Sequence, residues 1–221
     1  MTRRFLCCTL VVLCLYSIFP CRILAVETSA ASAILMDADS GRVLYERNAD
    51  RKMLIASTTK ILTALVAIEE GDLHDTVKVS REAAYTEGSA MYLTEGETLT
   101  LETLLYGLLL CSGNDAAVAI AQHIGGSVKG FVAMMNEKAA ALGLANTHFM
   151  NTSGLHDENH YSTVREIALI LQAALENETC TEILSAENYR ASETEQHPDG
   201  LAMTNKFLYR VHHEYALNGA E

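Results

Sequence analysis

The stretch Ile55-Ala56-Ser57-Thr58-Thr59-Lys60-Ile61-Leu62-Thr63-Ala64-Leu65 places polar residues directly before an apolar run with helical spacing. This pattern predicts a buried helix that begins near Ser57 and ends at about Glu70-Gly71. Residues three apart share one face of a helix, so the Ser57 hydroxyl and the Lys60 amine are expected to point the same way. A serine needs a neighbouring base to become a nucleophile, and a lysine is such a base when burial lowers its pKa. The alternative is a helix-capping serine followed by a surface lysine.

The N-terminal end of the chain has the layout of a secretory signal peptide. Arg3 and Arg4 precede an apolar run from Phe5 to Phe19, and a small residue, Ala25, offers a cleavage site. An uncleaved anchor is the alternative, but the run is short for a membrane span of about 20 residues. We therefore expect residues 1–25 to be a signal peptide, residues 26–221 to form the mature domain, and the protein to be exported.

Composition and charge limit the functions that fit the chain. Its 221 residues, 49% apolar and 20% charged, suit one sizeable globular core. Removal of residues 1–25 takes away three arginines and no acidic residue, so the net charge of −12 becomes −15. Such an acidic protein is not expected to be a general nucleic-acid or anionic-membrane binder. The two cysteines left, Cys111 and Cys180, show no metal or disulfide spacing, and we expect Cys111 to be a small buried residue.

The order of predicted elements indicates the fold class. A β-hairpin is expected over residues 31–46, with a turn at Ala38-Asp39-Ser40-Gly41. Further helices are expected over residues 100–110, 115–124, 127–142, 163–175 and 178–185, with a polar loop at 146–162 and extended chain at 188–205. Thr163 and Glu166 match a capping box at the start of one of these helices. This order predicts an α/β (α+β) fold in which a helical cluster packs on an antiparallel sheet.

A second polar constellation, Ser112-Gly113-Asn114, interrupts the two apolar helices expected before and after it. The polar break argues against a membrane span here. A polar tripeptide at such a break either caps the helix ends or lines a cleft. Beside Ser57 and Lys60, Ser112 is a candidate proton relay, and Asn114 is a candidate for holding a substrate amide and orienting Lys60. These are the roles that acyl transfer requires.

Two stretches around these residues resemble motifs of penicillin-binding proteins: residues 56–65 with Ser-x-x-Lys, and residues 104–117 with Ser-Gly-Asn. More narrowly, the chain resembles the low-molecular-weight D-alanyl-D-alanine carboxypeptidases, serine peptidase family S11. The likeness continues in Gly88-Ser89-Ala90-Met91-Tyr92-Leu93, Met135-Asn136-Glu137-Lys138-Ala139, Thr147-His148-Phe149-Met150-Asn151, Gly154-Leu155-His156-Asp157 and His160-Tyr161-Ser162-Thr163. It therefore spans essentially the whole mature chain.

The resemblance implies a transpeptidase-like (β-lactamase-like) fold and an exported serine enzyme that acts on peptidoglycan stem peptides ending in D-Ala-D-Ala. Ser57 would be the acyl-ester nucleophile, Lys60 the general base and Ser112 the proton relay. Asn114 would bind substrate. β-Lactams would acylate the same serine as inhibitors, and no metal or organic cofactor is implied. A C-terminal membrane anchor, frequent in this family, would lie beyond Glu221.

One family motif, Lys-Thr-Gly or a close variant on a strand beside the nucleophile, is not found in this sequence. Three lysines follow the second motif, in Lys129-Gly130-Phe131, Lys138-Ala139-Ala140 and Lys206-Phe207-Leu208. The missing strand would supply one backbone donor of the oxyanion hole, whose loss costs about 10²–10³ in rate. We therefore expect the sequence to be incomplete at its C-terminus, with the C-terminal strands missing and the 221-residue piece inactive.

Two other functions and one metal site are weighed against this interpretation. A serine β-lactamase would use the same serine and lysine, but fast deacylation needs a placed glutamate, and Gly113 stands where class A enzymes carry aspartate. An inactive peptidoglycan-binding fragment is the third alternative. A zinc site at His156 and His160 is not expected, because zinc protease motifs need helical histidines and a glutamate where this chain has Asp157. Loop packing near the cleft is the better interpretation of these histidines.

Overall fold

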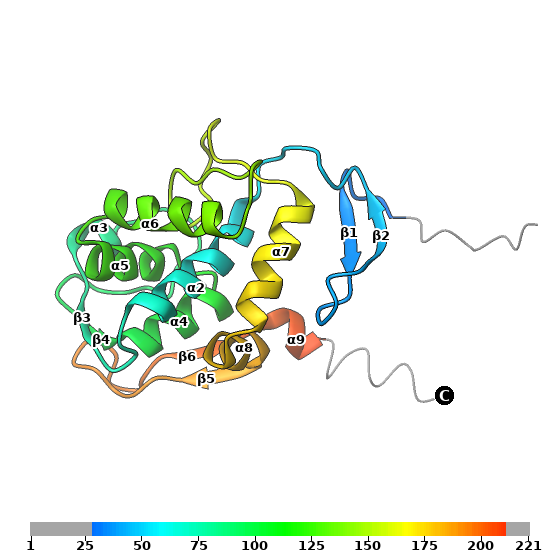
Figure 1. The fold of residues 1–221 in the computed structure, drawn as a ribbon. Helices are drawn as coiled ribbons and strands as arrows, with labels where there is room; N and C mark the ends of the chain where they lie inside the picture. Colours follow the sequence, from blue (N-terminus) through cyan, green and yellow to red (C-terminus); the bar gives the residue numbers. More distant parts are fainter. Residues whose placement is uncertain (1–27, 211–221) are drawn as a thin grey trace, which may run out of the picture. The chain divides into compact units, whose positions relative to one another are not determined.

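The computed structural model describes residues 28–210, so the expected signal peptide at residues 1–25 lies outside the described residues. The chain divides into two units, Met1–Ala30 and Ala31–Glu221. The elements of the second unit in chain order are β1 (Ala33–Met36), β2 (Val43–Arg47), the 3₁₀ helix η1 (Ala56–Thr58), α2 (Thr59–Glu70), β3 (Thr76–Lys78), α3 (Arg81–Ala84), β4 (Thr98–Thr100), α4 (Leu101–Leu110), α5 (Asn114–Gly125), α6 (Val128–Ala141), α7 (Val164–Leu175), α8 (Glu178–Ser185), β5 (Asn188–Arg190), β6 (Ala202–Thr204) and α9 (Lys206–Arg210) (Figure 1).

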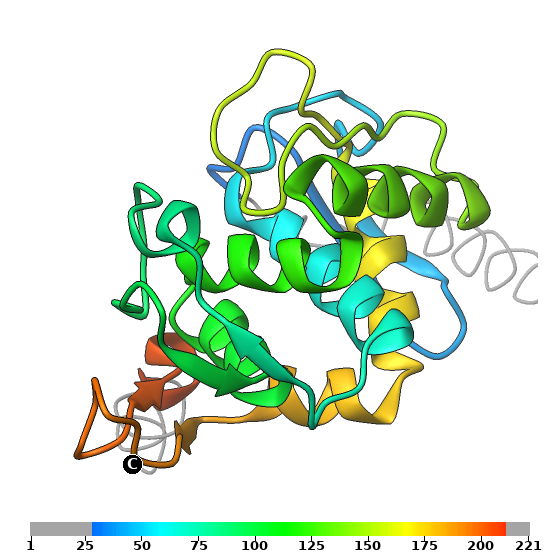
Figure 2. The same ribbon diagram turned by 90° about the vertical axis from the view of Figure 1, so that its left-hand side faces the viewer.

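Helix α2 is the centre of the helical cluster. Helices α4, α5, α6, α7 and α8 all pack against it, as Figures 1 and 2 show from two directions. Its apolar run is buried, with Leu62 and Ala64 fully inaccessible to solvent. The helix ends at Glu70, as the sequence predicts, but it is entered through the single 3₁₀ turn η1. This tighter turn places Ser57 just ahead of the α-helix instead of inside it.

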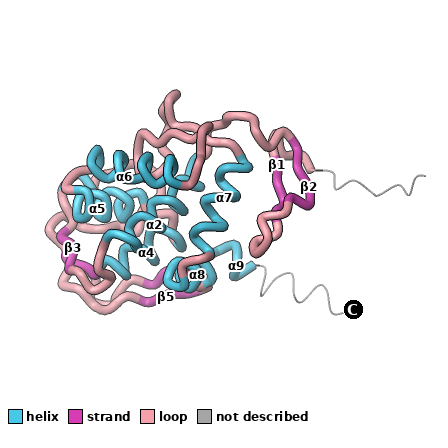
Figure 3. Tube along the Cα trace, viewed as in Figure 1, coloured by secondary structure: helices cyan, strands magenta, loops and turns pink. Residues whose placement is uncertain are grey.

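The strands form three separate two-stranded antiparallel sheets within residues 28–210: β1–β2, β3–β4 and β5–β6 (Figure 3). The predicted hairpin is confirmed, with Ala33 opposite Arg47 and an irregularity between Leu35 and Met36, and β1 contacts α7. The predicted combination of a helical cluster with antiparallel strands is confirmed, and the described strands are divided among three small sheets. Each strand pairs with the next strand along the chain, which keeps the loop-closure entropy small.

The helix boundaries follow the predicted signals, with one difference at α7. The Thr163 hydroxyl oxygen accepts the Glu166 N–H at 3.1 Å, as in a capping box. The Glu166 carboxylate does not bond back to Thr163. It accepts the Asn146 N–H at 3.0 Å and the Thr147 hydroxyl instead. The carboxylate thus provides a partner for a partly buried loop backbone donor, and it anchors the start of loop 146–162.

The apolar stretch 101–124 is two helices, α4 and α5, joined by a short non-helical link. No helix in residues 28–210 is long and apolar enough to cross a membrane. The prediction that these residues are buried helices of one core is confirmed, since both helices pack against α2 and contribute fully buried residues such as Leu104 and Ile120.

Candidate active site

Ser57 lies in η1, at the N-terminal end of the α2 region, and its side chain is exposed. The residue before it, Ala56, has a φ of +46°. This left-handed conformation costs a non-glycine residue on the order of 1 kcal/mol, and such strain persists only where the surrounding structure enforces it. The turn leaves the Ser57 hydroxyl accessible at a helix N-terminus, a position that favours a developing negative charge.

Lys60 lies one turn further along and is buried, with 2% of its surface exposed. Its Nζ donates to Ser57 Oγ at 3.3 Å and to the Ser153 carbonyl oxygen at 2.8 Å. Burial lowers the pKa of Lys60 from 10.5 to about 8, while the negative charge of Asp115 opposes the shift. A lysine with this pKa is neutral often enough near neutral pH to accept the serine proton. The structure therefore brings Ser57 and Lys60 together, as their three-residue spacing predicts.

Ser112 lies in the link between α4 and α5 and has a φ of +55°. It lines a cavity of about 670 Å³ whose walls also include Ser89, Cys111 and Lys206. In the part of the chain that the structure describes, no hydrogen bond joins its side chain to Ser57 or Lys60. Its role as a proton relay therefore stays a prediction.

Asn114 begins α5 and is buried, with 5% of its surface exposed. Its Nδ2 donates to the Glu87 carbonyl at 2.7 Å, and its backbone N–H donates to the Ser89 carbonyl at 2.7 Å. The expected bond to Lys60 is not found among the described contacts. The Asn114 side chain can take this position because residue 88 is glycine: its φ is +96°, and a Cβ there would lie 2.5 Å from the Asn114 amide nitrogen. The side chain therefore holds the neighbouring loop close to the start of α5.

Asp115 is a part of the site that sequence reasoning missed. It is 1% exposed, and its carboxylate accepts the backbone N–H groups of Met91, Leu93 and Ala116 at 3.0, 3.1 and 2.9 Å. Three donors compensate for burial of the charge. The same charge acts on the pKa of Lys60. In the sequence, Asp115 stands out only as an acidic residue inside an apolar helical stretch. That pattern argues against a membrane span, but it does not show which backbone groups the carboxylate binds.

The loop after α6 forms a wall beside Ser57, and the sequence predicts this loop but not the contacts that Ser153 and Gly154 make with the site. Ser153 offers the carbonyl that receives the Lys60 amine. Gly154 has a φ of +88°, and a Cβ at this position would lie 1.8 Å from the Ala56 carbonyl oxygen. Only glycine permits this approach of the loop backbone to the turn that carries the nucleophile.

His160, one of the three histidines of loop 146–162, is held by protein groups on both sides of its ring. His160 is 2% exposed, and both its ring nitrogens have protein partners, the Thr59 hydroxyl and the Met150 N–H. Among residues 28–210 no group of three or more metal-ligating side chains is suitably placed. The interpretation of His160 as a residue packed in the loop is confirmed.

Cys111 differs from the prediction of a buried core residue. It is only partly buried, because it lies in the wall of the cavity beside Ser112. Burial still raises the pKa of its thiol, with the Asp115 charge adding to the effect. Cys180 is fully buried between helices.

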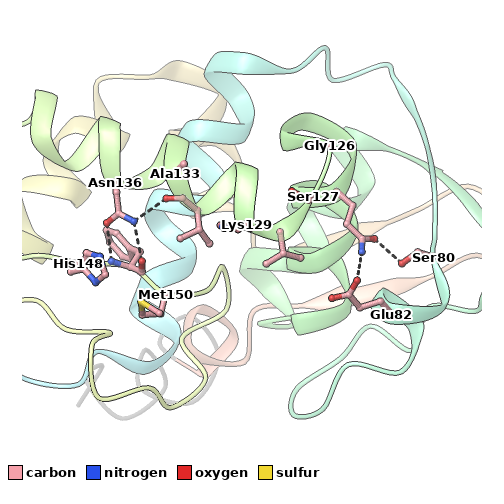
Figure 4. A pocket seen from close by; sticks show the side chains of 13 residues that line it. Ser80, Glu82, Gly126, Ser127, Lys129, Ala133, Asn136, His148 and Met150 are labelled. Atoms are coloured by element: carbon pink, nitrogen blue, oxygen red, sulfur yellow. Dashed lines mark hydrogen bonds between the residues drawn. The ribbon is translucent and has the colours of Figure 1, made fainter.

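A larger cavity, about 950 Å³, lies among α3, α5, α6 and the loop residues His148 to Met150 (Figure 4). Neither Ser57, Lys60 nor Ser112 lines it, so size alone does not mark the reactive centre. Figure 4 shows the Asn136 side chain at this cavity, beside the loop that carries His148 and Met150. Its amide bonds both backbone groups of Phe149, at 2.9 Å each.

Fold and site together define the transpeptidase-like class of proteins, and solved structures similar to this chain include a DD-transpeptidase. The chain belongs to the D-alanyl-D-alanine carboxypeptidase family of serine peptidases, S11, whose model matches residues 21–216. It is 40% identical over 173 residues to DacF of Bacillus subtilis, covering 76% of this chain and 44% of that protein. It is 39% identical over 160 residues to DacA of Escherichia coli, covering 67% and 40%. Both relatives are named D-alanyl-D-alanine carboxypeptidases.

Solved structures support the same assignment. A D-alanyl-D-alanine carboxypeptidase from Mycobacterium tuberculosis superposes with a TM-score of 0.76 at 35% identity, covering 81% of this chain and 67% of that one. A variant of a Streptomyces DD-transpeptidase gives 0.74 at 32% identity, covering 80% and 73%. The predicted family and fold class are therefore confirmed. The chain spans less than half the length of its curated relatives DacF and DacA.

Proposed function

We propose that the protein to which this chain belongs is a serine-type D-alanyl-D-alanine carboxypeptidase that removes the terminal D-alanine from peptidoglycan stem peptides. The observation that carries the proposal is an exposed Ser57 hydroxyl 3.3 Å from a buried lysine amine whose pKa is about 8. Family membership supplies the substrate class. β-Lactams would be inhibitors, because they acylate the serine that the substrate acylates.

The geometry supports an acyl-enzyme mechanism. Neutral Lys60 accepts the Ser57 proton as Oγ attacks the carbonyl carbon between the two D-alanines. The resulting oxyanion collapses, the peptide C–N bond breaks, and the leaving amine takes a proton from Lys60 through Ser112. A water molecule then attacks the ester and gives its proton to Lys60. The bond between Ser57 Oγ and the acyl carbon breaks, Lys60 returns the proton to Oγ, and the shortened peptide leaves. Asn114 would contact the substrate amide.

The oxyanion needs hydrogen-bond donors that are in place before the reaction. The backbone N–H of Ser57 is one candidate, because it belongs to the nucleophile itself. We expect the second donor from the strand that carries Lys-Thr-Gly in this family, a motif that this sequence does not contain. The second oxyanion donor therefore stays a prediction.

Location follows from the substrate. Peptidoglycan lies outside the cytoplasm, so we infer that the protein is exported and contributes to cell-wall organisation and cell shape. The signal-peptide pattern in residues 1–25 supports this inference. Anchoring to the membrane by a C-terminal segment stays a prediction.

The serine β-lactamase alternative is less well supported. Rapid deacylation requires a glutamate that activates water at the acyl-enzyme. The two buried glutamates in the described part of the chain are both engaged elsewhere: Glu97 with His197 and Thr194, and Glu166 with the Asn146 and Thr147 groups. A long-lived penicilloyl ester is therefore the expected product.

Two assays on the protein at its full natural length test the proposal. We expect release of D-alanine from a peptide ending in D-Ala-D-Ala, and a penicillin adduct that persists long after excess drug is removed. Rapid penicillin hydrolysis without D-alanine release would identify a β-lactamase. A folded protein with neither reaction would support the inactive peptidoglycan-binding alternative.

A further inference from the structure

A chain of three hydrogen bonds leads from loop 146–162 to the residue before the nucleophile. The Nδ1 atom of buried His160 accepts the Met150 backbone N–H at 3.1 Å, so the proton of the neutral ring must be on Nε2. The His160 Nε2–H then donates to Thr59 Oγ1 at 2.7 Å. The Thr59 hydroxyl in turn donates to the Ala56 carbonyl oxygen at 2.8 Å. Because the first donor is a backbone amide, every bond in the chain has a fixed direction.

This series of hydrogen bonds ends at the carbonyl oxygen of Ala56, a residue whose backbone the fold holds in an unfavourable conformation. Ala56 has a φ of +46°, and the backbone of Gly154 packs directly on its oxygen. The peptide unit is planar, so a fixed Ala56 carbonyl also fixes the Ser57 N–H at the opposite side of the same unit. The Ser57 N–H is the candidate oxyanion donor. The hydrogen-bond chain therefore controls the direction in which this donor points.

We propose that Thr59 and His160 are positioning residues, which hold the Ala56–Ser57 peptide plane so that the Ser57 N–H points at the oxyanion formed during acylation. This inference rests on the proposed function and adds residues to it. Neither side chain touches the reacting atoms, since Thr59 is fully buried and the two ring nitrogens of His160 bond to Thr59 and Met150.

Two features maintain the hydrogen bonds that join Met150, His160, Thr59 and Ala56. Burial lowers the pKa of His160, which keeps the ring neutral, as the acceptor role of Nδ1 requires; the Asp157 charge opposes this shift and His148 adds to it. Asn136 holds Phe149, the neighbour of Met150, from the side of the larger cavity (Figure 4). The amide that starts the chain is thus itself fixed.

Four single variants and one double variant of the full-length protein test the inference. Thr59→Val and His160→Phe each break the chain, and each should lower the acylation rate constant for penicillin by about 10-fold to 100-fold, since small misplacements of reacting groups cost up to about 10². Non-covalent affinity for penicillin should change little. His160→Gln should recover most of the rate, because glutamine can accept through Oε1 and donate through Nε2. Ser162→Ala is the matched control: it removes another buried hydroxyl of the same loop, bonded to Thr147.

Ser162→Ala should lower the melting temperature about as much as Thr59→Val while leaving the acylation rate unchanged. The double variant Thr59→Val/His160→Phe should be no slower than the slower single variant, because both break one chain. Wild-type rates in Thr59→Val and His160→Phe, or an equal rate loss in Ser162→Ala, would overturn the inference.

The Ser57 amide provides a readout that does not depend on acylation. Its NMR resonance should shift in Thr59→Val and His160→Phe and stay in place in Ser162→Ala; an unmoved resonance in the first two variants would also overturn the inference. If wild-type protein reacts with neither penicillin nor peptide, the proposed function fails, and the amide resonance still decides whether the positioning is real.

Discussion

The starts of helices α2 and α5 carry the two serines of the site, and they are held in different ways. Each has a non-glycine residue in the left-handed region, Ala56 before Ser57 and Ser112 itself. Side chains and backbone from about 100 residues further along fix the α2 start, through Ser153, Gly154 and His160. Contacts from nearer in the sequence fix the α5 start: the Gly113 N–H donates to Gly107, the Asn114 N–H to Ser89, and the Asn114 side chain to Glu87, which is 27 residues away.

The two helix starts meet different requirements, a fixed position for the Ser57 nucleophile and space around Ser112 for a substrate and a proton. The Ser57 turn is surrounded by buried groups, so its geometry depends on the path of a distant loop. The Ser112 turn faces an open cavity, where a substrate group and a mobile proton need room. We therefore expect substitutions in loop 146–162 to change the position of Ser57 and to leave the position of Ser112 unchanged.

The largest effect is expected from Ser57→Ala, which should abolish penicillin acylation. Its melting temperature should match that of the wild type, because the exposed side chain makes little contribution to packing. Ser112→Ala should slow acylation without abolishing it. Gel labelling with a fluorescent penicillin measures acylation of both variants. Residual labelling of Ser57→Ala would mean that Ser57 is not the residue that penicillin acylates.

Lys60→Met should lower the acylation rate constant by about 10²–10⁴, the usual contribution of a general base. It should not lower the melting temperature at pH 7. Because the pKa of Lys60 falls from 10.5 to about 8 on folding, its charged form is disfavoured in the folded state below pH 8, and methionine removes that penalty. A strongly destabilised Lys60→Met would show that the lysine is structural. Lys129→Met, at an exposed position, is the control.

Gly154→Ala should be the most destabilising of the alanine substitutions at left-handed glycines. A Cβ at Gly154 would lie 1.8 Å from the Ala56 oxygen, whereas Gly143, with a φ of +75°, has no atom within 4 Å. We expect a loss of about 1 kcal/mol in unfolding free energy for Gly143→Ala, and about 3 kcal/mol or more for Gly154→Ala. Urea unfolding measures both values. Equal losses would contradict the close contact between the loop and the Ser57 turn.

Asp115→Asn should have the smallest effect on acylation, a shift in pH dependence, although it should lower stability because an amide nitrogen cannot accept the backbone N–H groups that the carboxylate accepts. The acylation rate of the wild type should rise with pH through about 8, as Lys60 loses its proton. Since the Asp115 charge raises the pKa of Lys60, its removal should move this rise to lower pH. Asp75→Asn, which removes a surface partner of His123, should leave the profile in place. An unmoved profile in Asp115→Asn would show that its charge does not act on Lys60.

The parts of the site that the sequence predicted are those with local geometry. Ser57 and Lys60 are three residues apart on one helix, and the starts and ends of the long helices follow capping and glycine signals. Ser153 and His160 lie 93 and 101 residues from their partners, so their contacts depend on a loop path that no local pattern encodes. Glu166 shows the same limit: its capping motif was recognised, but its carboxylate binds Asn146 and Thr147.

The central claim, that Ser57 is the nucleophile, is tested most directly by peptide mapping after penicillin treatment of the full-length protein. Tandem mass spectrometry should find the penicilloyl group on the peptide that contains Ser57, attached to that residue. An adduct on Ser112 or any other residue, or no adduct on a correctly folded protein, would contradict the claim.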